Sequence, residues 1–224
     1  MKYSTVIFDL DGTLLDTAAG IMIGASYTAN KMGSLKLTEN QQRSFIGPPI
    51  IDSFIRECSF SESKARKAVE IYRQRYKEKG MYEAKVYPRI NKMLELLLEK
   101  GYKTAVATLK RDDFAKDILK YFGLSDYINV IKGMDHLDSL SKTDIIFMCL
   151  KQLKENDFSR VVLIGDSYYD AIGAEEVGID FIAVTYGYGF KNKEEAKQSK
   201  HIFIADSVDE IIRYLKLYDV DRNL

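Results

Sequence analysis

Two aspartates one residue apart, Asp9 and Asp11, follow the apolar run 6–8 and precede Gly12. The apolar run predicts a buried strand, which places both acids at its end. Side chains two residues apart on an extended chain point the same way, so both carboxylates can face one ligand unless a turn at Gly12 directs Asp11 away. Carboxylates this close stay ionised at low cost only with a cation between them, and otherwise one holds a proton. The segment therefore indicates metal or acid–base chemistry, with a plain Asp-Gly turn as the alternative.

The chain after residue 84 alternates strand-like apolar runs with helical patterns. Strands separated by helices require right-handed crossovers and give a parallel sheet covered on both faces. We therefore expect an α/β fold with a Rossmann-like parallel sheet core. The expected strands are 103–108, 128–131, 161–164, 181–184 and 202–204, and the expected helices are 88–100, 112–122, 142–153 and 209–217.

Residues 17–84 show helical patterns and no strand pattern. Residues 18–32 are small and apolar, Thr38 offers the N-cap oxygen of a second helix, and apolar spacing from Ser61 to Gly80 predicts a longer one. The sequence thus predicts an α-helical domain, 17–84, inserted into a core made of 1–16 and 85–224.

Other polar residues lie where expected strands end. Thr108 ends the strand 103–108, Asp166 follows the strand 161–164, and Asp170 lies one helical turn beyond Asp166. Ligands of such sheets bind beyond the carboxyl ends of the strands, where the strand order reverses. We therefore expect these residues to share one site with Asp9 and Asp11. The alternatives are that Thr108 caps a helix and Asp166 begins a turn.

Composition narrows the functional classes. Lys plus Arg and Asp plus Glu each number 33 in the 224 residues, so no net charge attracts nucleic acid or an anionic membrane. Cys58 and Cys149 lack metal-site spacing and indicate thiols in a reducing compartment. The first apolar run is too short for a signal peptide or a membrane span. We expect a cytoplasmic monomer or homodimer that binds neither nucleic acid nor membrane.

Four segments resemble the motifs of the haloacid dehalogenase superfamily of phosphohydrolases. They are 8–16 for the first motif, 106–108 for the second, Lys142 within 139–144 for the third, and 164–179 for the fourth. The insertion 17–84 is similar to the α-helical cap of that family, and 45–49 with 185–189 resemble its phosphoglycolate-phosphatase-type branch.

This resemblance implies a role for each motif residue. Asp9 is the nucleophile that forms an aspartyl-phosphate, and Asp11 is the general acid and base. Mg²⁺ suits the neutralisation of a phosphate dianion beside a carboxylate. The expected metal ligands are Asp9, the backbone carbonyl of Asp11 and Asp166, with Asp170 either a further ligand or a residue that supports one. The expected phosphate-binding residues are Gly12, Thr108, Leu109 and Lys142.

Two positions leave questions open. Leu109 stands where the family commonly has Asn or Ser, so only its backbone N–H remains for phosphate. Lys110 competes with Lys142 for the cationic role. Lys142 begins an expected helix, where a lysine is electrostatically unfavourable, and this favours a function. Lys110 is equally compatible with the solvated surface.

The sequence predicts a Mg²⁺-dependent phosphatase acting on a small phosphorylated metabolite, of phosphoglycolate-phosphatase type. Nucleoside 5′-monophosphates and pyrophosphate are the alternative substrates. A phosphosugar mutase and a non-catalytic phospho-acceptor or binding scaffold are the alternative functions. The helical domain is expected to close over the site on hinges at 16–17 and 85–88.

Overall fold

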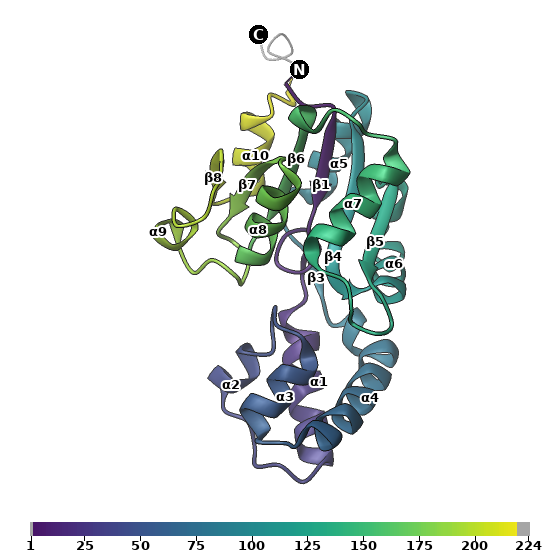
Figure 1. The fold of residues 1–224 in the computed structure, drawn as a ribbon, viewed down its shortest axis with the longest axis vertical. Helices are drawn as coiled ribbons and strands as arrows, with labels where there is room; N and C mark the ends of the chain where they lie inside the picture. Colours follow the sequence, from purple (N-terminus) through teal and green to yellow (C-terminus); the bar gives the residue numbers. More distant parts are fainter. Residues whose placement is uncertain (1, 219–224) are drawn as a thin grey trace. The chain divides into compact units, whose positions relative to one another are not determined.

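The computed structural model describes residues 2–218 of the chain (Figure 1). It divides into two compact units, a core unit of Met1–Leu15 with Val86–Leu224 and a helical unit of Asp16–Lys85. The chain passes between the units through two short paired strands, β2 (Leu15–Asp16) and β3 (Lys85–Val86). Among the described residues, no helix has both the length and the apolar composition of a membrane span.

The core unit contains a six-stranded sheet in which every pairing is parallel. Its order is β5-β4-β1-β6-β7-β8, so β1 pairs with β4 on one side and with β6 on the other. The strand order therefore reverses at β1, which confirms the predicted Rossmann-like arrangement and puts its ligand site at the end of β1. The strands are β1 (Thr5–Phe8), β4 (Lys103–Arg111), β5 (Val130–Met134), β6 (Val161–Gly165), β7 (Asp180–Val184) and β8 (Phe203–Ala205).

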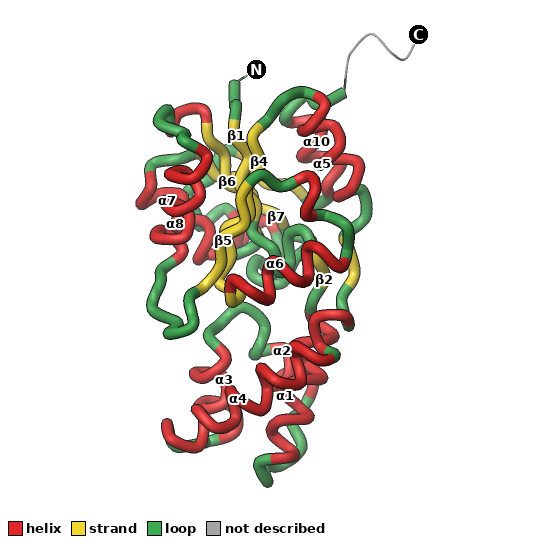
Figure 2. Tube along the Cα trace, turned by 90° about the vertical axis from the view of Figure 1, so that its right-hand side faces the viewer, coloured by secondary structure: helices red, strands yellow, loops and turns green. Residues whose placement is uncertain are grey.

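Helices cover both faces of this sheet, as predicted. Figure 2 shows α7 and α8 on one side and α5, α6 and α10 on the other. The central strands are fully buried apolar runs, which is the pattern that a sheet covered on both faces requires. The helices are α5 (Ile90–Glu99), α6 (Asp112–Tyr121), α7 (Lys142–Leu153), α8 (Tyr168–Val177), α9 (Lys193–Ala196) and α10 (Val208–Tyr214), with 3₁₀ turns η2 (Ser125–Tyr127) and η3 (Phe158–Arg160).

Two strand predictions differ from the structure by more than one residue. The strand expected at 103–108 continues to Arg111, because a bulge lets the chain rejoin the ladder after residue 107. The strand expected at 128–131 begins two residues later, since Ile128 caps the turn η2 and Asn129 uses its side-chain oxygen to accept the backbone N–H of Thr104 at 2.8 Å.

The helical unit consists of four α-helices and one 3₁₀ turn. Thr38 caps its helix as predicted, through a capping box with Gln41. Glycines of the first helix let it pack closely on its neighbours: a Cβ on Gly24 would lie 2.8 Å from the ring of Tyr72 in α4, and a Cβ on Gly20 would lie 2.0 Å from the backbone oxygen of Gly80 in the 3₁₀ turn. The elements are α1 (Ala18–Lys31), α2 (Glu39–Arg43), α3 (Ile50–Cys58), α4 (Glu62–Glu78) and η1 (Gly80–Tyr82).

We expect Gly20→Ala to destabilise the helical unit by about 1–3 kcal/mol, although alanine is the better helix former, because the added methyl group meets backbone that cannot rotate away. Gly24→Ala is the matched substitution in the same helix. Its Cβ meets the ring of Tyr72 at 2.8 Å, and a ring can shift, so we expect a smaller loss. Thermal unfolding of both variants tests this order, and equal stability of Gly20→Ala and wild type would contradict it.

Candidate active site

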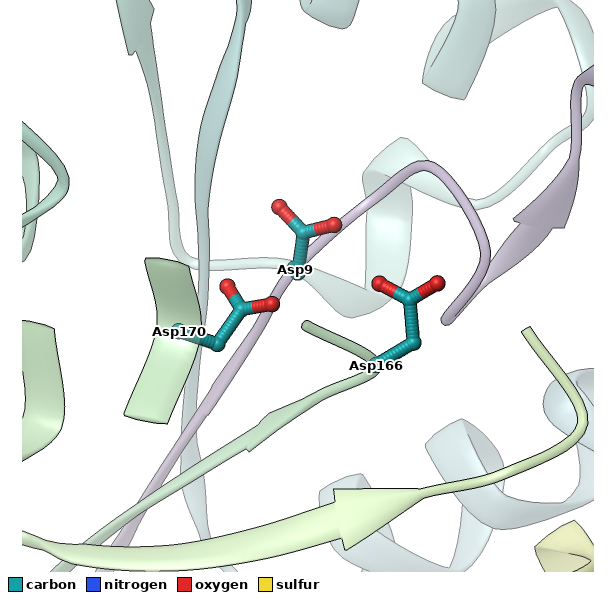
Figure 3. Close-up of side chains that lie close together, drawn as sticks. All are labelled: Asp9, Asp166 and Asp170. Carbon is teal, nitrogen blue, oxygen red and sulfur yellow. The ribbon is translucent and has the colours of Figure 1, made fainter. Parts of the chain in front are cut away.

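Three buried carboxylates converge at the carboxyl end of the sheet. Asp9 follows β1, Asp166 follows β6, and Asp170 lies in the first turn of α8. Each offers one oxygen atom that lies within 4.8 Å of the other two, and Figure 3 shows the three side chains side by side. The sheet topology thus brings together three of the predicted site residues at the point where the strand order reverses.

Burial and mutual repulsion make it costly to ionise this cluster. Burial raises the pKa of Asp9 to about 8; Lys142 opposes this shift, and the neighbouring carboxylates add to it. Burial and the charge of Asp170 raise the pKa of Asp166 to about 7, against two backbone N–H donors that lower it. Such carboxylates favour either a bound proton or a nearby cation.

Lys142 is the resident cation of the cluster. It is the first residue of α7, directly after Ser141, whose side chain caps the helix. Its buried Nζ lies 2.6 Å from Oδ1 of Asp9 and 2.5 Å from Oδ1 of Asp170. Burial by itself would lower the pKa of this lysine, but the two carboxylates outweigh burial and raise it. The two carboxylates therefore favour the charged form of Lys142 beside Asp9.

Lys110 lies in the same region but contacts another carboxylate. Its Nζ is 3.0 Å from Oδ1 of Asp11, and its side chain is only 8% exposed. The alternative that Lys110 lies on the solvated surface is therefore wrong. The Asp11 carboxylate, in turn, is not a member of the cluster formed by the other three aspartates among the described residues. The Asp11 carboxylate therefore pairs with Lys110 and not with the cluster, while its charge still adds to the raised pKa of Asp9.

Thr108 and Leu109 occupy the bulge in β4. Thr108 is buried, and its Oγ1 accepts the backbone N–H of Lys110 at 3.1 Å. The alternative role for Thr108, capping the following helix, is wrong, because Arg111 holds the N-cap position of α6. The Leu109 side chain packs against the hydrophobic core cluster. This packing gives a physical reason for an apolar side chain at that position.

Sequence reasoning missed the loop after β7 as part of the site. The backbone N–H groups of Tyr188 and Gly189 donate to Oδ2 of Asp166 at 2.6 and 3.0 Å, and the N–H of Phe190 donates to its backbone oxygen at 2.7 Å. A Cβ on Gly187 would lie 2.4 Å from the same Oδ2. The glycines spaced one residue apart were the available signal, because such spacing indicates a close approach of the backbone.

Gly12 also leaves space for Asp166. It has a φ of +82°, and a Cβ there would lie 2.2 Å from Oδ2 of Asp166. The hydroxyl of Tyr186 donates to the backbone oxygen of Thr13 at 3.1 Å, and its ring packs edge-on against Tyr87. The turn after Asp11 is thus fixed from the β7 side. The structure shows this packing role for Gly12, while phosphate binding stays a prediction.

The donors fit a hard divalent cation. All are carboxylate oxygens, and Mg²⁺ favours oxygen ligands. When all four carboxylates are ionised, they exceed the two ammonium groups of the region by two negative charges, which one divalent cation balances. Asp170 is held in place because its Oδ2 accepts the backbone N–H and the hydroxyl of Ser167 at 3.1 and 2.6 Å. A fixed, acidic, buried oxygen cluster is what a metal site requires.

The fold and this site together define an α/β protein with a buried carboxylate cluster where the strand order of its parallel sheet reverses. The chain belongs to the haloacid dehalogenase-like hydrolases, whose family model matches residues 6–184. Phosphatases are among the named relatives, so the predicted enzyme class, a phosphatase of this family, is confirmed.

Several relatives cover nearly the whole chain. A 5′-nucleotidase of Pseudomonas aeruginosa is 30% identical over 201 residues, which are 90% of this chain and 91% of the relative. The tyrosine-protein kinase PtkA of Mycobacterium tuberculosis is 33% identical over 207 residues, 92% of this chain and 70% of the kinase. A phosphoglycolate phosphatase of Vibrio parahaemolyticus is 27% identical over 215 residues, 92% of this chain and 93% of the relative.

A solved structure shows the same likeness. The haloacid dehalogenase-like family hydrolase SP0104 of Streptococcus pneumoniae superimposes with a TM-score of 0.86 at 32% identity. The superposition covers 96% of this chain and 99% of that one. Both the helical unit and the core unit therefore have counterparts in a solved member of the family.

Proposed function

We propose that the protein is a Mg²⁺-dependent phosphatase that hydrolyses a small phosphate monoester through an aspartyl-phosphate on Asp9. The observation that carries this proposal is the contact of Lys142 with Asp9 inside a buried carboxylate cluster. A phosphate dianion is repelled by a carboxylate unless positive charge lies beside both. The ammonium group of Lys142 provides part of that positive charge. The carboxylates that no ammonium group neutralises favour the binding of a divalent cation, which provides the rest.

Asp9, Asp166 and Asp170 would hold the cation, with the backbone carbonyl of Asp11 as a further ligand. When bound, Mg²⁺ supplies positive charge to the phosphate oxygens and to the attacking carboxylate. Lys142 orients the Asp9 carboxylate from the other side. Asp170 holds Lys142 in turn through a second ion pair with its ammonium group. The role of these residues is positioning and electrostatic stabilisation.

The reaction takes two displacements at phosphorus. An oxygen of Asp9 attacks in line, the ester P–O bond breaks, and Asp11 gives its proton to the leaving oxygen. Water then attacks the aspartyl-phosphate, Asp11 takes a proton from that water, and the bond to Asp9 breaks to release inorganic phosphate. Thr108, Lys142 and the backbone N–H groups of Gly12 and Leu109 would hold the transferred oxygens.

The helical unit is the proposed cap. We assign residues 17–84 to it, with hinges at 16–17 and 85–88, where the chain runs through the short strands β2 and β3. A closed cap excludes water and selects substrates by shape. Small phosphomonoesters of the phosphoglycolate type are the first substrate class, supported by the Vibrio relative. Nucleoside 5′-monophosphates are the second, supported by the Pseudomonas 5′-nucleotidase.

Phosphate release from a panel of compounds tests the proposal. The panel contains phosphoglycolate, sugar phosphates, nucleoside 5′-monophosphates and pyrophosphate, each with Mg²⁺ or with EDTA. We expect release that requires Mg²⁺ and that falls at least about 1,000-fold in Asp9→Asn, because the amide is no nucleophile. Conversion of a sugar 1-phosphate without phosphate release would instead indicate a mutase. A folded wild type that releases no phosphate from any compound would contradict the proposal.

A further inference from the structure

We propose that Lys110 is a positioning residue that holds the carboxyl group of Asp11 for proton transfer to the leaving oxygen. This inference rests on the proposed function, since it assigns a task within that reaction. It concerns a second lysine, distinct from the one that contacts the nucleophile.

The two buried lysines contact different carboxylates. Nζ of Lys110 lies 3.0 Å from Oδ1 of Asp11, while Nζ of Lys142 contacts Asp9 and Asp170. Both lysine side chains are buried, at 8% and 5% exposure. The two ammonium groups are thus divided between the proposed nucleophile and the proposed acid–base residue. A partly buried ion pair fixes a short carboxylate more firmly than a solvent-exposed pair does.

A bulge in the backbone of β4 determines the position of Lys110. The ladder pairs Ala107 with Lys132 and Arg111 with Met134, so residues 108–110 stand opposite Gly133 alone. This bulge turns Lys110 out of the regular strand alternation, and the hydroxyl of Thr108 accepts its N–H. Bulges of this kind redirect side chains near active sites.

Gly133 on β5 makes the bulge possible. A Cβ there would lie 2.4 Å from the backbone oxygen of Lys110 and 2.8 Å from the backbone nitrogen of Asp112. The N–H of Gly133 donates to Oδ1 of Asp112 at 3.0 Å, which ties the following helix to the same point. The position of Lys110 is therefore fixed by two strands and a helix start.

The role follows from what Asp11 must do. The proton moves from the Asp11 carboxyl group to the leaving oxygen as the ester bond breaks and the bond to Asp9 forms. Lys110 gives up no proton in this step and only keeps the carboxyl group in reach. A misplaced acid slows the hydrolysis of esters with poor leaving groups, such as alkoxides, because these need a proton as they depart. It has little effect on p-nitrophenyl phosphate, because p-nitrophenolate departs without a proton.

The test compares kcat/KM for an alkyl phosphate with kcat/KM for p-nitrophenyl phosphate, both with Mg²⁺. For Lys110→Met we expect a loss of about 30- to 100-fold on the alkyl ester and of about threefold on the aryl ester. Lys110→Arg should recover part of the alkyl activity, because it restores the cation. Lys2→Met is the matched control, since Lys2 forms a more exposed lysine–aspartate pair with Asp180 at the start of β7, the end of the strands opposite the site, and it should match wild type on both esters.

A titration of the metal-free protein with Mn²⁺ distinguishes a positioning role of Lys110 from general damage to the site. Lys110→Met should bind Mn²⁺ as wild type does, because the carboxylate that Lys110 pairs with, that of Asp11, is not one of the three clustered carboxylates. Equal losses on the two esters, or no loss on either, would overturn the role. A wild type without metal-dependent activity would overturn the proposed function itself, whereas an active wild type with uniformly affected variants would overturn only this inference.

Discussion

Lys142→Met should lower the free energy of unfolding of the metal-free protein by about 3–5 kcal/mol at pH 9 and by much less at pH 6. The lysine is the ammonium partner of two buried carboxylates, those of Asp9 and Asp170. Removing one partner of a buried ion pair leaves charge without compensation, and this costs more than the pair itself contributes.

The pH dependence follows from the pKa of Asp9, which is raised from 3.8 to about 8 in the folded protein. Between these values the folded protein holds a proton that the unfolded chain has released, so the free energy of unfolding falls as the pH rises. Lys142 lowers this pKa, and its loss raises the pKa further. The variant therefore continues to lose stability at pH values where wild type has levelled off, and its deficit grows.

Urea unfolding in EDTA at pH 6 and pH 9 measures both effects. Lys151→Met is the matched control, because Lys151 is an exposed lysine of the same helix, α7. This control should unfold like wild type at both pH values. A deficit of Lys142→Met that is the same at pH 6 and pH 9 would show that lost packing, and not uncompensated charge, causes it.

Gly187→Ala is expected to weaken Mg²⁺ binding by about 10- to 100-fold. The added Cβ would lie 2.3 Å from the backbone oxygen of Gly12 and 2.4 Å from Oδ2 of Asp166. Either the Asp166 carboxylate rotates or the loop after β7 withdraws. Both movements disturb the two N–H donors that now hold Oδ2. Phosphatase activity at limiting Mg²⁺ should fall by a similar factor.

Calorimetric titration with Mg²⁺ tests this substitution. The control is Gly178→Ala, which also adds a methyl group after a core element. Gly178 has a φ of +82°, and a Cβ added there would meet no atom within 4 Å, so its substitution costs about 1–2 kcal/mol of backbone strain without touching the site. Unchanged metal affinity in a folded Gly187→Ala would show that Asp166 does not depend on this loop for its orientation.

Local patterns were sufficient for the fold. Uninterrupted apolar runs marked the central strands, and polar caps such as Thr38 marked helix starts, because both signals depend on neighbouring residues. Alternation of strands and helices then left few topologies, and the structure has the predicted parallel sheet with helices on both faces. The ends of elements were less determined. The strand 103–108 continued to Arg111 because β5 offers a glycine opposite the bulge, which no local pattern within β4 specifies.

The sequence by itself determined that acidic and basic residues stand at the ends of particular strands and helices. Only the tertiary structure decided which of them meet. Lys142 and Asp9 are 133 residues apart, and their contact depends on β1 and α7 being placed by the crossovers of the sheet. The same packing brings Lys110 into contact with Asp11, and the loop after β7 into contact with Asp166. Such contacts depend on how the chain folds in three dimensions, because no local sequence signal specifies a distant partner, such as one 133 residues away.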